Sequence, residues 1–327
     1  MILVRSPFRI SFVGGTTDLP AWSNQHAGAV VSTTIDKSCW ITVRHRKPFF
    51  PHKYRIVYSK VEQVQTIDEI QHPAVRACLT LLKLDDGVEI HTDGDLPARS
   101  GMGASSSFVV GLLLGLHALR GEWVSKYRLA DEAIVVEQDL LKETVGLQDP
   151  IAAAYGGLNR IDFTKDQRFS VNPIPLLADR VEEFRKHMVL VYTGGSRENT
   201  SSEITQAYHL EEQSRHLRVL HSMVDEAVSI LSGGGDLAPF GHLLHDAWRL
   251  KRDLGKISTP EIDLLVDRVR AAGATGQKLL GAGGGGFLLV FGPPSKIAGS
   301  IREALKDWIL VDFDLSSEGA SVALFAR

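Results

Sequence analysis

Three glycine- or serine-rich segments lie far apart in this chain, and each one lies beside an apolar run. They are residues 9–18 (RISFVGGTTD), 96–108 (LPARSGMGASSSF) and 278–287 (KLLGAGGGGF). Glycine lets a backbone turn sharply and approach a ligand without a Cβ in the way. The middle segment can hold the phosphates of a nucleotide, and the outer two can shape a site around it. The set favours phosphoryl transfer from ATP to a small polar substrate.

The middle segment combines glycines with the start of a helix. Gly101 and Gly103 precede Ser105, Ser106 and Ser107, and a long apolar run follows. The unpaired N–H groups and the positive dipole end of such a helix form an anion site, and serine hydroxyls can ligate Mg²⁺. A plain N-capped helix would explain the serines alone. The glycines and the apolar helix behind them favour phosphate binding.

The third segment satisfies the pattern GxGxxG at Gly281, Gly283 and Gly286. A dinucleotide-binding fold needs a strand before this pattern and a helix after it. Here we expect a helix before it, at residues 261–272, and a strand after it, at residues 287–291. A nicotinamide cofactor is therefore not expected. Four successive glycines instead favour a backbone that passes close to another loop or to bound phosphates. The alternative interpretation is a flexible hairpin-like turn.

Several other catalytic patterns are absent from the sequence. There is no GxxxxGK[ST], no HRD or DFG, no GxSxG and no HExxH. His242 and His245 lie one helical turn apart without a paired carboxylate motif, so we interpret them as ordinary histidines. The chain therefore has no Walker-type P-loop and no protein-kinase site.

Composition narrows the class of protein further. The 327 residues are 44% hydrophobic and 23% charged, which is typical of a globular protein with a sizeable core. A net charge of −3 gives no basic face for nucleic acid or an acidic membrane. With only Cys39 and Cys78, no disulfide framework is expected and a reducing compartment fits best.

No targeting or membrane segment is expected either. The first twelve residues are interrupted by Arg5, Pro7 and Arg9, so they lack the apolar region of a signal peptide. The longest apolar run, residues 108–116, is shorter than the ~20 residues that span a bilayer. We therefore predict a soluble, cytoplasmic protein with no nucleic-acid or membrane partner. Its oligomeric state stays open.

Hydrophobic periodicity and turn residues predict a mixed order of elements. Strands are predicted over residues 2–13, 29–46, 88–92, 158–163, 188–192, 287–291 and 321–325. Helices are predicted over residues 105–119, 126–142, about 200–232, 238–254, 260–272 and 295–307. The run Asn172-Pro173-Ile174-Pro175 is the best candidate linker. It divides the chain into predicted domains of residues 1–175 and 176–327.

Taken together, the three segments resemble the GHMP kinases, the family named for galactokinase, homoserine kinase, mevalonate kinase and phosphomevalonate kinase. Their second motif has the form P-x-x-x-G-L-G-S-S-S/A. Residues 97–106 (PARSGMGASS) match it, with Met102 for leucine and Ala104 for the first serine. Residues 278–287 match the third motif. The resemblance covers nearly the whole chain and implies an α+β, two-domain fold with an N-terminal ATP-binding domain and a ferredoxin-like (split βαβ) C-terminal domain.

The resemblance also implies roles for particular residues. Asp149, in GLQDP, matches the catalytic aspartate, which takes or aligns the proton of an alcohol nucleophile. Arg9 would stabilise charge on the transferring phosphoryl group. Ser105 and Glu137 match the Mg²⁺ ligands, and hard oxygen donors suit that ion. The residues expected to bind ATP are Pro97, Ser100, Gly101, Met102, Gly103, Ala104, Ser105, Ser106 and Ser107.

The first segment would line the pocket of a sugar substrate. Asp18 would accept hydrogen bonds from hydroxyls, and Arg197 would be a lid arginine, with a solvated loop cation as the alternative. The residues expected to bind the substrate are Gly15, Thr16, Thr17, Asp18, Arg197, Gly283 and Gly284.

Within the family, residues 9–20, 146–157 and 243–263 resemble the branch that phosphorylates a heptose phosphate. Galactokinases carry a Glu-His pair where this chain has Gly15-Thr16. The implied reaction moves the γ-phosphate of ATP to the anomeric hydroxyl of D-glycero-D-manno-heptose 7-phosphate, towards nucleotide-activated heptose for surface glycans. A fucose- or galactose-type sugar kinase, or a sugar-binding regulator on the same fold, remains possible. Candidates for holding the distal phosphate are Arg44, Arg46, Lys53, Arg55 and Arg76.

Overall fold

The computed structural model describes residues 1–166, 168–194, 213–255 and 257–326. Within these residues the strands form two sheets, one of nine strands and one of four. The large sheet has the order β13-β1-β2-β5-β3-β4, with β6 and β12 also paired to β2 and β7 paired to β6. Its strands are β1 (Ile2–Val13), β2 (Gly28–His45), β3 (Tyr54–Val57), β4 (Val61–Val64), β5 (Val88–Gly94), β6 (Leu158–Phe163), β7 (Phe169–Pro173), β12 (Leu315–Ser316) and β13 (Ser321–Phe325).

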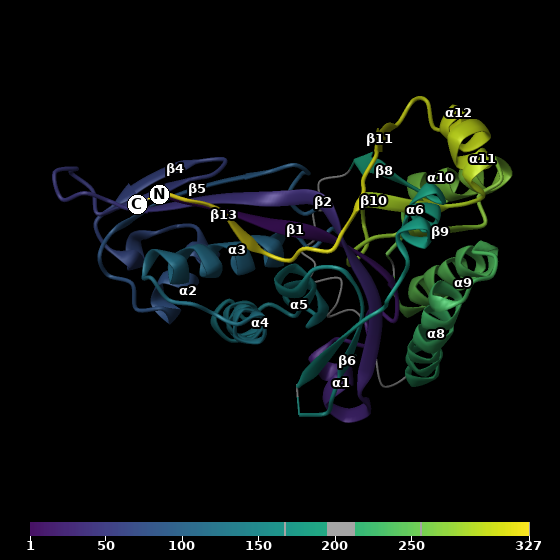
Figure 1. Ribbon diagram of the computed structural model, residues 1–327, viewed down its shortest axis with the longest axis horizontal. Helices are drawn as coiled ribbons and strands as arrows, with labels where there is room; N and C mark the ends of the chain where they lie inside the picture. Colours follow the sequence, from purple (N-terminus) through teal and green to yellow (C-terminus); the bar gives the residue numbers. More distant parts are fainter. Residues whose placement is uncertain (167, 195–212, 256, 327) are drawn as a thin grey trace.

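Helices cover one face of the large sheet (Figure 1). The longest of them, α3, packs against β1 and β2, and its apolar side chains are buried along most of its length. Burying a continuous apolar helix against a sheet supplies the main driving force for this half of the fold. The helices on this side are α2 (Pro73–Leu81), α3 (Ala104–Leu119), α4 (Lys126–Ile134) and α5 (Gln148–Tyr155); α1 (Pro20–His26) follows β1.

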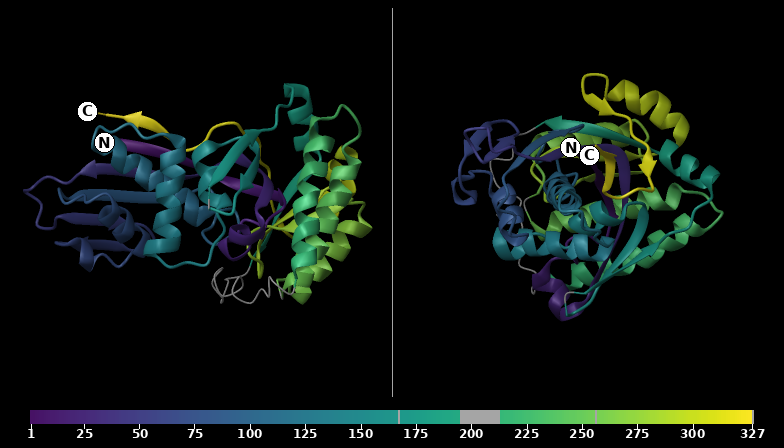
Figure 2. Two further views of the ribbon diagram at one scale, coloured as in Figure 1. Left: turned by 90° about the horizontal axis from the view of Figure 1, so that it is seen from below. Right: turned by 60° about the vertical axis from the view of Figure 1, so that its left-hand side comes forward.

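The second sheet has the order β11-β8-β10-β9, and all of its described pairs are antiparallel. In chain order this is 4-1-3-2 with helices after the first and third strands, which is the split βαβ, ferredoxin-like arrangement. Its strands are β8 (Met188–Gly194), β9 (Gly276–Leu279), β10 (Gly286–Phe291) and β11 (Ile309–Val311). Figure 2 shows the long helices of this half packed side by side. They are α8 (Ser214–Ser232), α9 (Ala238–Leu254) and α10 (Pro260–Ala271), and the shorter helices are α6 (Ala178–Lys186), α11 (Pro294–Lys296) and α12 (Arg302–Ala304).

Aromatic side chains join the two halves where β1 ends. The rings of Phe12, Phe184 and Phe240 pack edge to face, with centroids 5.0–5.4 Å apart. Phe12 belongs to β1 and Phe240 to α9. Through this contact, a helix of the small-sheet half packs against the end of the large sheet. Such ring pairs add about 0.5–1.5 kcal/mol each beyond the area that they bury. The last two strands, β12 and β13, return to the large sheet. The predicted division between residues 175 and 176 stays a prediction.

The predicted elements agree with the structure where periodicity is long and clear. The bounds predicted for residues 2–13, 158–163, 238–254 and 321–325 are those of β1, β6, α9 and β13. The helix predicted over 126–142 is regular only to Ile134, and a π-helical stretch, Val135–Leu140, follows. The strand β9 was not predicted. It lies between α10 and the glycines of the third segment, so β9 precedes these glycines and β10 follows them. A dinucleotide-binding motif needs a helix after the glycines, and a strand follows here instead.

In the part of the chain that the structure describes, no helix is both long enough and apolar enough to cross a membrane.

A buried histidine ties α3 to α4. His117 has no exposed surface, and its Nδ1 and Nε2 lie 3.0 Å from Glu122 Oε2 and 2.6 Å from Glu132 Oε2. Burial lowers the pKa of His117, but the hydrogen bonds with Glu132 and Glu122 outweigh it, so the pKa is raised. The imidazolium form therefore stabilises the helix pair.

Replacing His117 with glutamine is expected to lower the free energy of unfolding by about 1–3 kcal/mol near pH 6 and by less near pH 9. The histidine pKa is raised in the folded state, so its stabilisation is complete below the ordinary value of 6.5 and is lost as pH rises through the folded value. Urea titrations at both pH values measure this difference. The exposed His45→Gln variant is the control, and equal losses at both pH values would contradict the assignment.

Candidate active site

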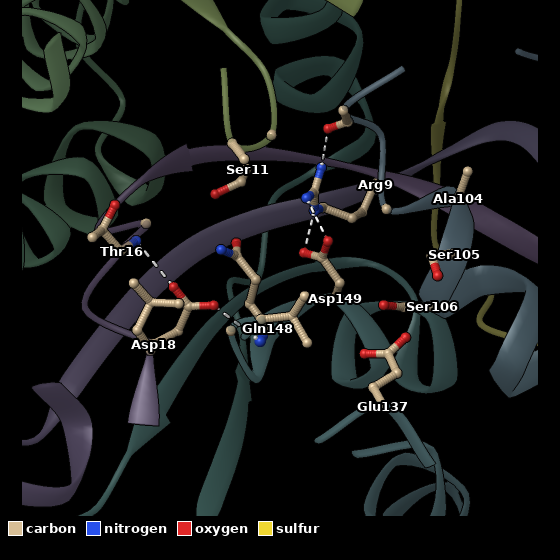
Figure 3. Close-up of a pocket in the computed structure, with 18 of the residues that line it drawn as sticks. Arg9, Ser11, Thr16, Asp18, Ala104, Ser105, Ser106, Glu137, Gln148 and Asp149 are labelled. Carbon is tan, nitrogen blue, oxygen red and sulfur yellow. Dashed lines mark hydrogen bonds and ion pairs between the residues drawn. The ribbon is translucent and has the colours of Figure 1, made fainter. Parts of the chain in front are cut away.

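A pocket of about 310 Å³ brings together side chains from both halves of the molecule (Figure 3). Its walls come from β1 and the following loop, the start of α3, the π-helical stretch, the start of α5, α9 and the third glycine segment. The lining residues are Arg9, Ser11, Gly15, Thr16, Asp18, Leu19, Arg99, Gly101, Gly103, Ala104, Ser105, Ser106, Glu137, Glu143, Val145, Gly146, Gln148, Asp149, Lys251, Lys278, Gly281 and Ala282.

Arg9 and Asp149 form a bidentate ion pair in the middle of this pocket. Arg9 Nε lies 2.6 Å from Asp149 Oδ1, and Arg9 Nη2 lies 2.7 Å from Oδ2. The remaining group, Nη1, donates to the carbonyl of Gly101 at 2.7 Å. Bidentate charge-assisted pairs fix orientation as well as contributing energy. Arg9 therefore joins β1, α5 and the second glycine segment into one unit.

The second segment turns directly over this ion pair. Gly103 has φ +72°, and a Cβ built there would lie 3.1 Å from Arg9 Cγ and 3.4 Å from Asp149 Oδ2. Both the conformation and the space therefore favour glycine. The third segment is tied to the second, because the backbone N–H of Phe287 donates to the carbonyl of Ser100 at 3.1 Å. The two glycine segments thus meet beside the pocket, as predicted for loops that pass close together.

Glu137 lies beside the start of α3 (Figure 3). Its side chain is buried, it accepts a hydrogen bond from Ser106, and Oε1 has no hydrogen-bond partner among the described residues. Burial, together with the charges of Asp149 and Glu143, raises the pKa of Glu137 to about 8, although the Ser106 hydrogen bond opposes this. A buried carboxylate oxygen of this kind is a ready ligand for a cation.

Asp18 occupies the other end of the pocket from Glu137 (Figure 3). Its Oδ1 accepts from the backbone of Thr16 at 3.0 Å, and its Oδ2 accepts from the backbone of Gln148 at 3.3 Å. Burial and then the charge of Asp149 raise its pKa, against the effect of these hydrogen bonds. Gly146 packs on the carboxylate, since a Cβ there would lie 1.9 Å from Oδ2. The side chain is thus fixed beside Asp149.

Four pocket residues with buried polar side chains carry no role in the sequence prediction. Ser11 Oγ and Gln148 Oε1 are buried and have no partner among the described residues, which makes both available to a polar ligand. Lys251 and Lys278 are also buried and line the pocket from α9 and β9. Lys278 and Gln148 lie inside or beside the recognised motifs, so proximity to a motif was the one available signal. Lys251 had none.

The predicted site residues fall into three groups. Those that line the pocket are Arg9, Gly15, Thr16, Asp18, Gly101, Gly103, Ala104, Ser105, Ser106, Glu137 and Asp149. Those that lie outside its lining are Thr17, Pro97, Ser100, Met102, Ser107, Gly283 and Gly284. Among them, Thr17 Oγ1 donates to the carbonyl of Gly14 at 2.7 Å and Ser107 Oγ donates to the carbonyl of Pro7 at 2.7 Å. The N–H of Gly284 donates to the carbonyl of Ile257. Arg197 lies outside the described residues.

Two family models match this chain. Residues 71–157 match the GHMP kinases N terminal domain, and residues 223–309 match the GHMP kinases C terminal domain. Together they cover just over half of the sequence, including the start of α3, Glu137, Asp149 and the third glycine segment. The chain belongs to the GHMP kinase family. It is therefore a kinase that uses ATP as phosphate donor and an alcohol as acceptor, and the resemblance inferred from its three motifs is confirmed.

Individual relatives point to sugars. This kinase is 27% identical to a D-glycero-alpha-D-manno-heptose 7-phosphate kinase from Campylobacter jejuni, with 97% of each chain covered. It is also 27% identical to the L-fucokinase/L-fucose-1-P guanylyltransferase of Bacteroides fragilis, over 98% of this chain and 38% of that protein. The solved structure of a D-glycero-D-manno-heptose 1-phosphate kinase from Bacteriodes thetaiotaomicron has a TM-score of 0.82, 20% identity and full coverage of both chains. These likenesses confirm the two-domain α+β fold and a sugar-kinase activity.

Replacing Gly146 with alanine in this GHMP kinase is expected to raise KM for the sugar acceptor by roughly tenfold or more, because the new Cβ displaces the Asp18 carboxylate. KM for ATP should change by no more than about twofold, since Asp18 lies at the other end of the pocket from the start of α3. Initial-rate kinetics with each substrate varied in turn measure the split. Gly235→Ala, at a position with open space around it, is the control. A rise in KM for ATP alone would contradict this reading of Asp18.

Proposed function

We propose that this kinase transfers the γ-phosphoryl group of ATP to the anomeric hydroxyl of D-glycero-D-manno-heptose 7-phosphate, giving the 1,7-bisphosphate. The observation that carries the proposal is the position of Asp149. Arg9 holds it between the start of α3, where phosphates can bind, and Asp18, which faces the acceptor end of the pocket. The similarity to the Campylobacter jejuni kinase over nearly the full length of both chains supports the substrate. The product would supply the synthesis of nucleotide-activated heptose for surface glycans.

The chemistry follows from the ion pair. A carboxylate that accepts a bidentate arginine still has lone pairs free on both oxygens. One of these lone pairs accepts the hydrogen bond of the anomeric hydroxyl. As the hydroxyl oxygen of the sugar attacks the γ-phosphorus of ATP, Asp149 takes the hydroxyl proton. The bond from this phosphorus to the bridging oxygen breaks, and ADP leaves. Arg9 positions the carboxylate, and its charge favours the negative phosphoryl group that passes beside it.

ATP would bind at the second glycine segment. Gly103, the N-cap residue of α3, has no side chain that could cap the helix, so its first N–H groups can meet phosphate oxygens. The helix dipole favours negative charge there. Gly101 and Gly103 leave the backbone open on the pocket side. Ser105 and Ser106 add hydroxyl donors at the same point. Most of the contacts proposed for ATP are therefore to the backbone, which explains the glycine-rich composition of the segment.

The residues beside this segment fit Mg²⁺. Glu137 offers a buried oxygen without a partner among the described residues, and the hydroxyls of Ser105 and Ser106 are the adjacent hard donors. The ion usually takes one or two protein ligands and completes its shell with phosphates and waters. When bound, Mg²⁺ would neutralise charge on the ATP phosphates and fix their orientation. Glu137 and Ser105 are the proposed ligands.

Two other functions remain as candidates. A fucose-type or galactose-type sugar kinase would share Asp149, Arg9 and Glu137. The match of nearly this whole chain to 38% of the Bacteroides fragilis L-fucokinase/L-fucose-1-P guanylyltransferase favours it. A sugar-binding regulator on the same fold is disfavoured by the intact Arg9–Asp149 pair, because binding alone does not require a positioned base.

An acceptor panel tests the function directly. ATP consumption is measured with D-glycero-D-manno-heptose 7-phosphate, the unphosphorylated heptose, L-fucose and D-galactose at equal concentrations. The proposed function requires the highest kcat/KM with heptose 7-phosphate and a product whose new phosphate is on C1 by ³¹P NMR. A higher kcat/KM with L-fucose or D-galactose would replace it with the corresponding sugar kinase, and no turnover with any sugar would favour the regulator.

Asp149→Asn is expected to lower kcat by about 10²–10⁴ while ATP binds with nearly unchanged affinity. The amide keeps the size of the side chain but cannot accept a proton and pairs poorly with Arg9. Single-turnover rates and calorimetric ATP titration separate the two effects. Asp139→Asn changes an exposed carboxylate in the same region and is the matched control. Wild-type turnover in Asp149→Asn would remove this residue from the mechanism.

Glu137→Gln is expected to have opposite effects on stability and on activity. The raised folded-state pKa of about 8 means that this carboxyl favours folding only in its protonated form, so stability is lost as pH rises from 4.5 to about 8. At pH 8 without Mg²⁺ the glutamine variant should therefore have the higher melting temperature. It should also need more Mg²⁺ for half-maximal activity. An unchanged Mg²⁺ titration would mean that the ion binds elsewhere.

A further inference from the structure

We propose that Ser11, Gly15 and Gln148 form a subsite that recognises one ring hydroxyl of the acceptor sugar, other than the anomeric hydroxyl that reacts. Ser11 and Gln148 would bind this hydroxyl, and Gly15 would leave the space for it. The inference rests on the proposed function and names residues that would decide which sugar the kinase accepts.

Two buried polar groups line the pocket without a partner. The exposed fractions of Ser11 and Gln148 are 5% and 9%, and both residues line the pocket that contains Asp149. Neither Ser11 Oγ nor Gln148 Oε1 has a hydrogen-bond partner among the described residues. A buried polar group without a partner destabilises a folded protein. Two such groups in one pocket therefore indicate a ligand with complementary polar atoms.

Gly15 places both groups around one open space. A Cβ built on Gly15 would lie 3.5 Å from Ser11 Oγ and 3.7 Å from Gln148 Nε2, which are ordinary contact distances. The φ angle of Gly15 lies outside the left-handed region. Neither a clash nor the backbone conformation therefore requires glycine at this position. Its missing side chain instead keeps open the space between Ser11 and Gln148.

The chemistry of this wall favours a hydroxyl over a phosphate. The side chain of Gln148 forms a hydrogen bond with Asp18, so its amide nitrogen faces that carboxylate and Oε1 is left for a ligand. An amide oxygen only accepts, so the ligand must supply a proton, which a phosphate dianion lacks. A hydroxyl can donate to Gln148 Oε1 and accept from Ser11 Oγ at the same time. The residues predicted from sequence for the distal phosphate, at positions 44, 46, 53, 55 and 76, do not line this pocket.

The position of the subsite fits a sugar that reacts at Asp149. Figure 3 shows Ser11 and the amide of Gln148 on the opposite side of the Arg9–Asp149 pair from Glu137. Arg9 and Ser11 are two positions apart on β1, so their side chains share one face of the strand and are roughly 7 Å apart along it. A sugar with its anomeric hydroxyl at Asp149 would then place another ring hydroxyl beside Ser11.

The test combines single variants with acceptors that lack one hydroxyl. Ser11→Ala removes only the hydroxyl, and the carbonyl that accepts from Lys278 stays. Gln148→Met keeps the length of the side chain and removes the amide. Ser6→Ala is the matched control, because Ser6 is on the same strand, is buried without a partner among the described residues and lies outside the pocket. Each enzyme is assayed with heptose 7-phosphate, with its 2-deoxy, 3-deoxy and 4-deoxy analogues, and with ATP varied separately.

Ser11→Ala is expected to lower kcat/KM for heptose 7-phosphate by roughly 5- to 50-fold, with KM for ATP within about twofold of wild type. One deoxy analogue should be a poor acceptor for the wild type and lose no more than about twofold further in Ser11→Ala, because a contact that is already missing cannot be lost again. Gln148→Met should single out the same analogue. The inference is overturned if the variants lose equally with all four acceptors, if they single out different analogues, or if only KM for ATP rises.

Stability separates a ligand-binding role from a structural one. Without substrates, Ser11→Ala should melt at or above the temperature of the wild type, because it removes a buried hydroxyl that has no partner. A lower melting temperature would show that this hydroxyl has a partner within the protein, and the inference would fall.

Gly15→Ala tests the open space. The added methyl group meets only ordinary contacts, so the melting temperature should stay near that of the wild type. The same methyl group would displace the sugar hydroxyl and lower kcat/KM for heptose 7-phosphate by roughly tenfold or more, with KM for ATP within about twofold. Unchanged kinetics with heptose 7-phosphate would mean that no part of the acceptor occupies this space, against the inference.

Failure of the inference and failure of the proposed function give different results. If the wild type prefers heptose 7-phosphate and Ser11→Ala and Gln148→Met lose nothing with it, the subsite is wrong and the function stands. If the wild type prefers another sugar, the deoxy analogues of that sugar are used. One analogue that couples to both variants would then keep the subsite and replace the assigned substrate. If no sugar is phosphorylated, both are wrong.

Discussion

The ion pair between Arg9 and Asp149 is the interaction on which the rest of the site depends. It joins residues 140 positions apart in sequence, and the third arm of the guanidinium holds the carbonyl of Gly101. One arginine thereby fixes the relative positions of three parts of the site: the proposed base, the strand that leads to Asp18 and the turn that begins α3. Side chains whose orientation is fixed in this way lose little entropy when substrates arrive, which is how a preformed site lowers an activation barrier.

Sequence reasoning located the parts of the site that depend on local chemistry. Glycine and serine patterns marked the start of α3 and the third segment, because backbone conformation leaves a clear compositional signal. It did not locate Lys251 or the close packing of Gly146 on Asp18, because both depend on tertiary contacts between distant segments. Strand β9 was missed for a related reason. It has four residues and includes a buried lysine, which a hydrophobic pattern does not predict for a strand.

Among the described residues, the buried titratable groups Asp18, Glu137 and Lys278 of the site form no ion pair. Burial raises the pKa values of Asp18 and Glu137 and lowers that of Lys278. Each shift means that the charged form of the group is less favourable in the folded protein than in water. Ligands of opposite charge would restore that balance, so substrate binding and protein stability should be closely coupled in this enzyme. The same coupling would explain why the proposed site carboxylates Asp18 and Glu137 are tolerated at buried positions.

Strand β1, which carries Arg9, lies between β2 and β13 in the large sheet. Its first residues pair with the strand Ser321–Phe325, and Ile2 is opposite Phe325. During synthesis, β1 is made first but gains this second neighbour only after residue 325 has left the ribosome. Because such contacts close very large loops, they form late and slow the overall folding rate. The sheet that supports the arginine can therefore be completed only after translation of the small-sheet half, so the order of ribosomal synthesis delays maturation of the site.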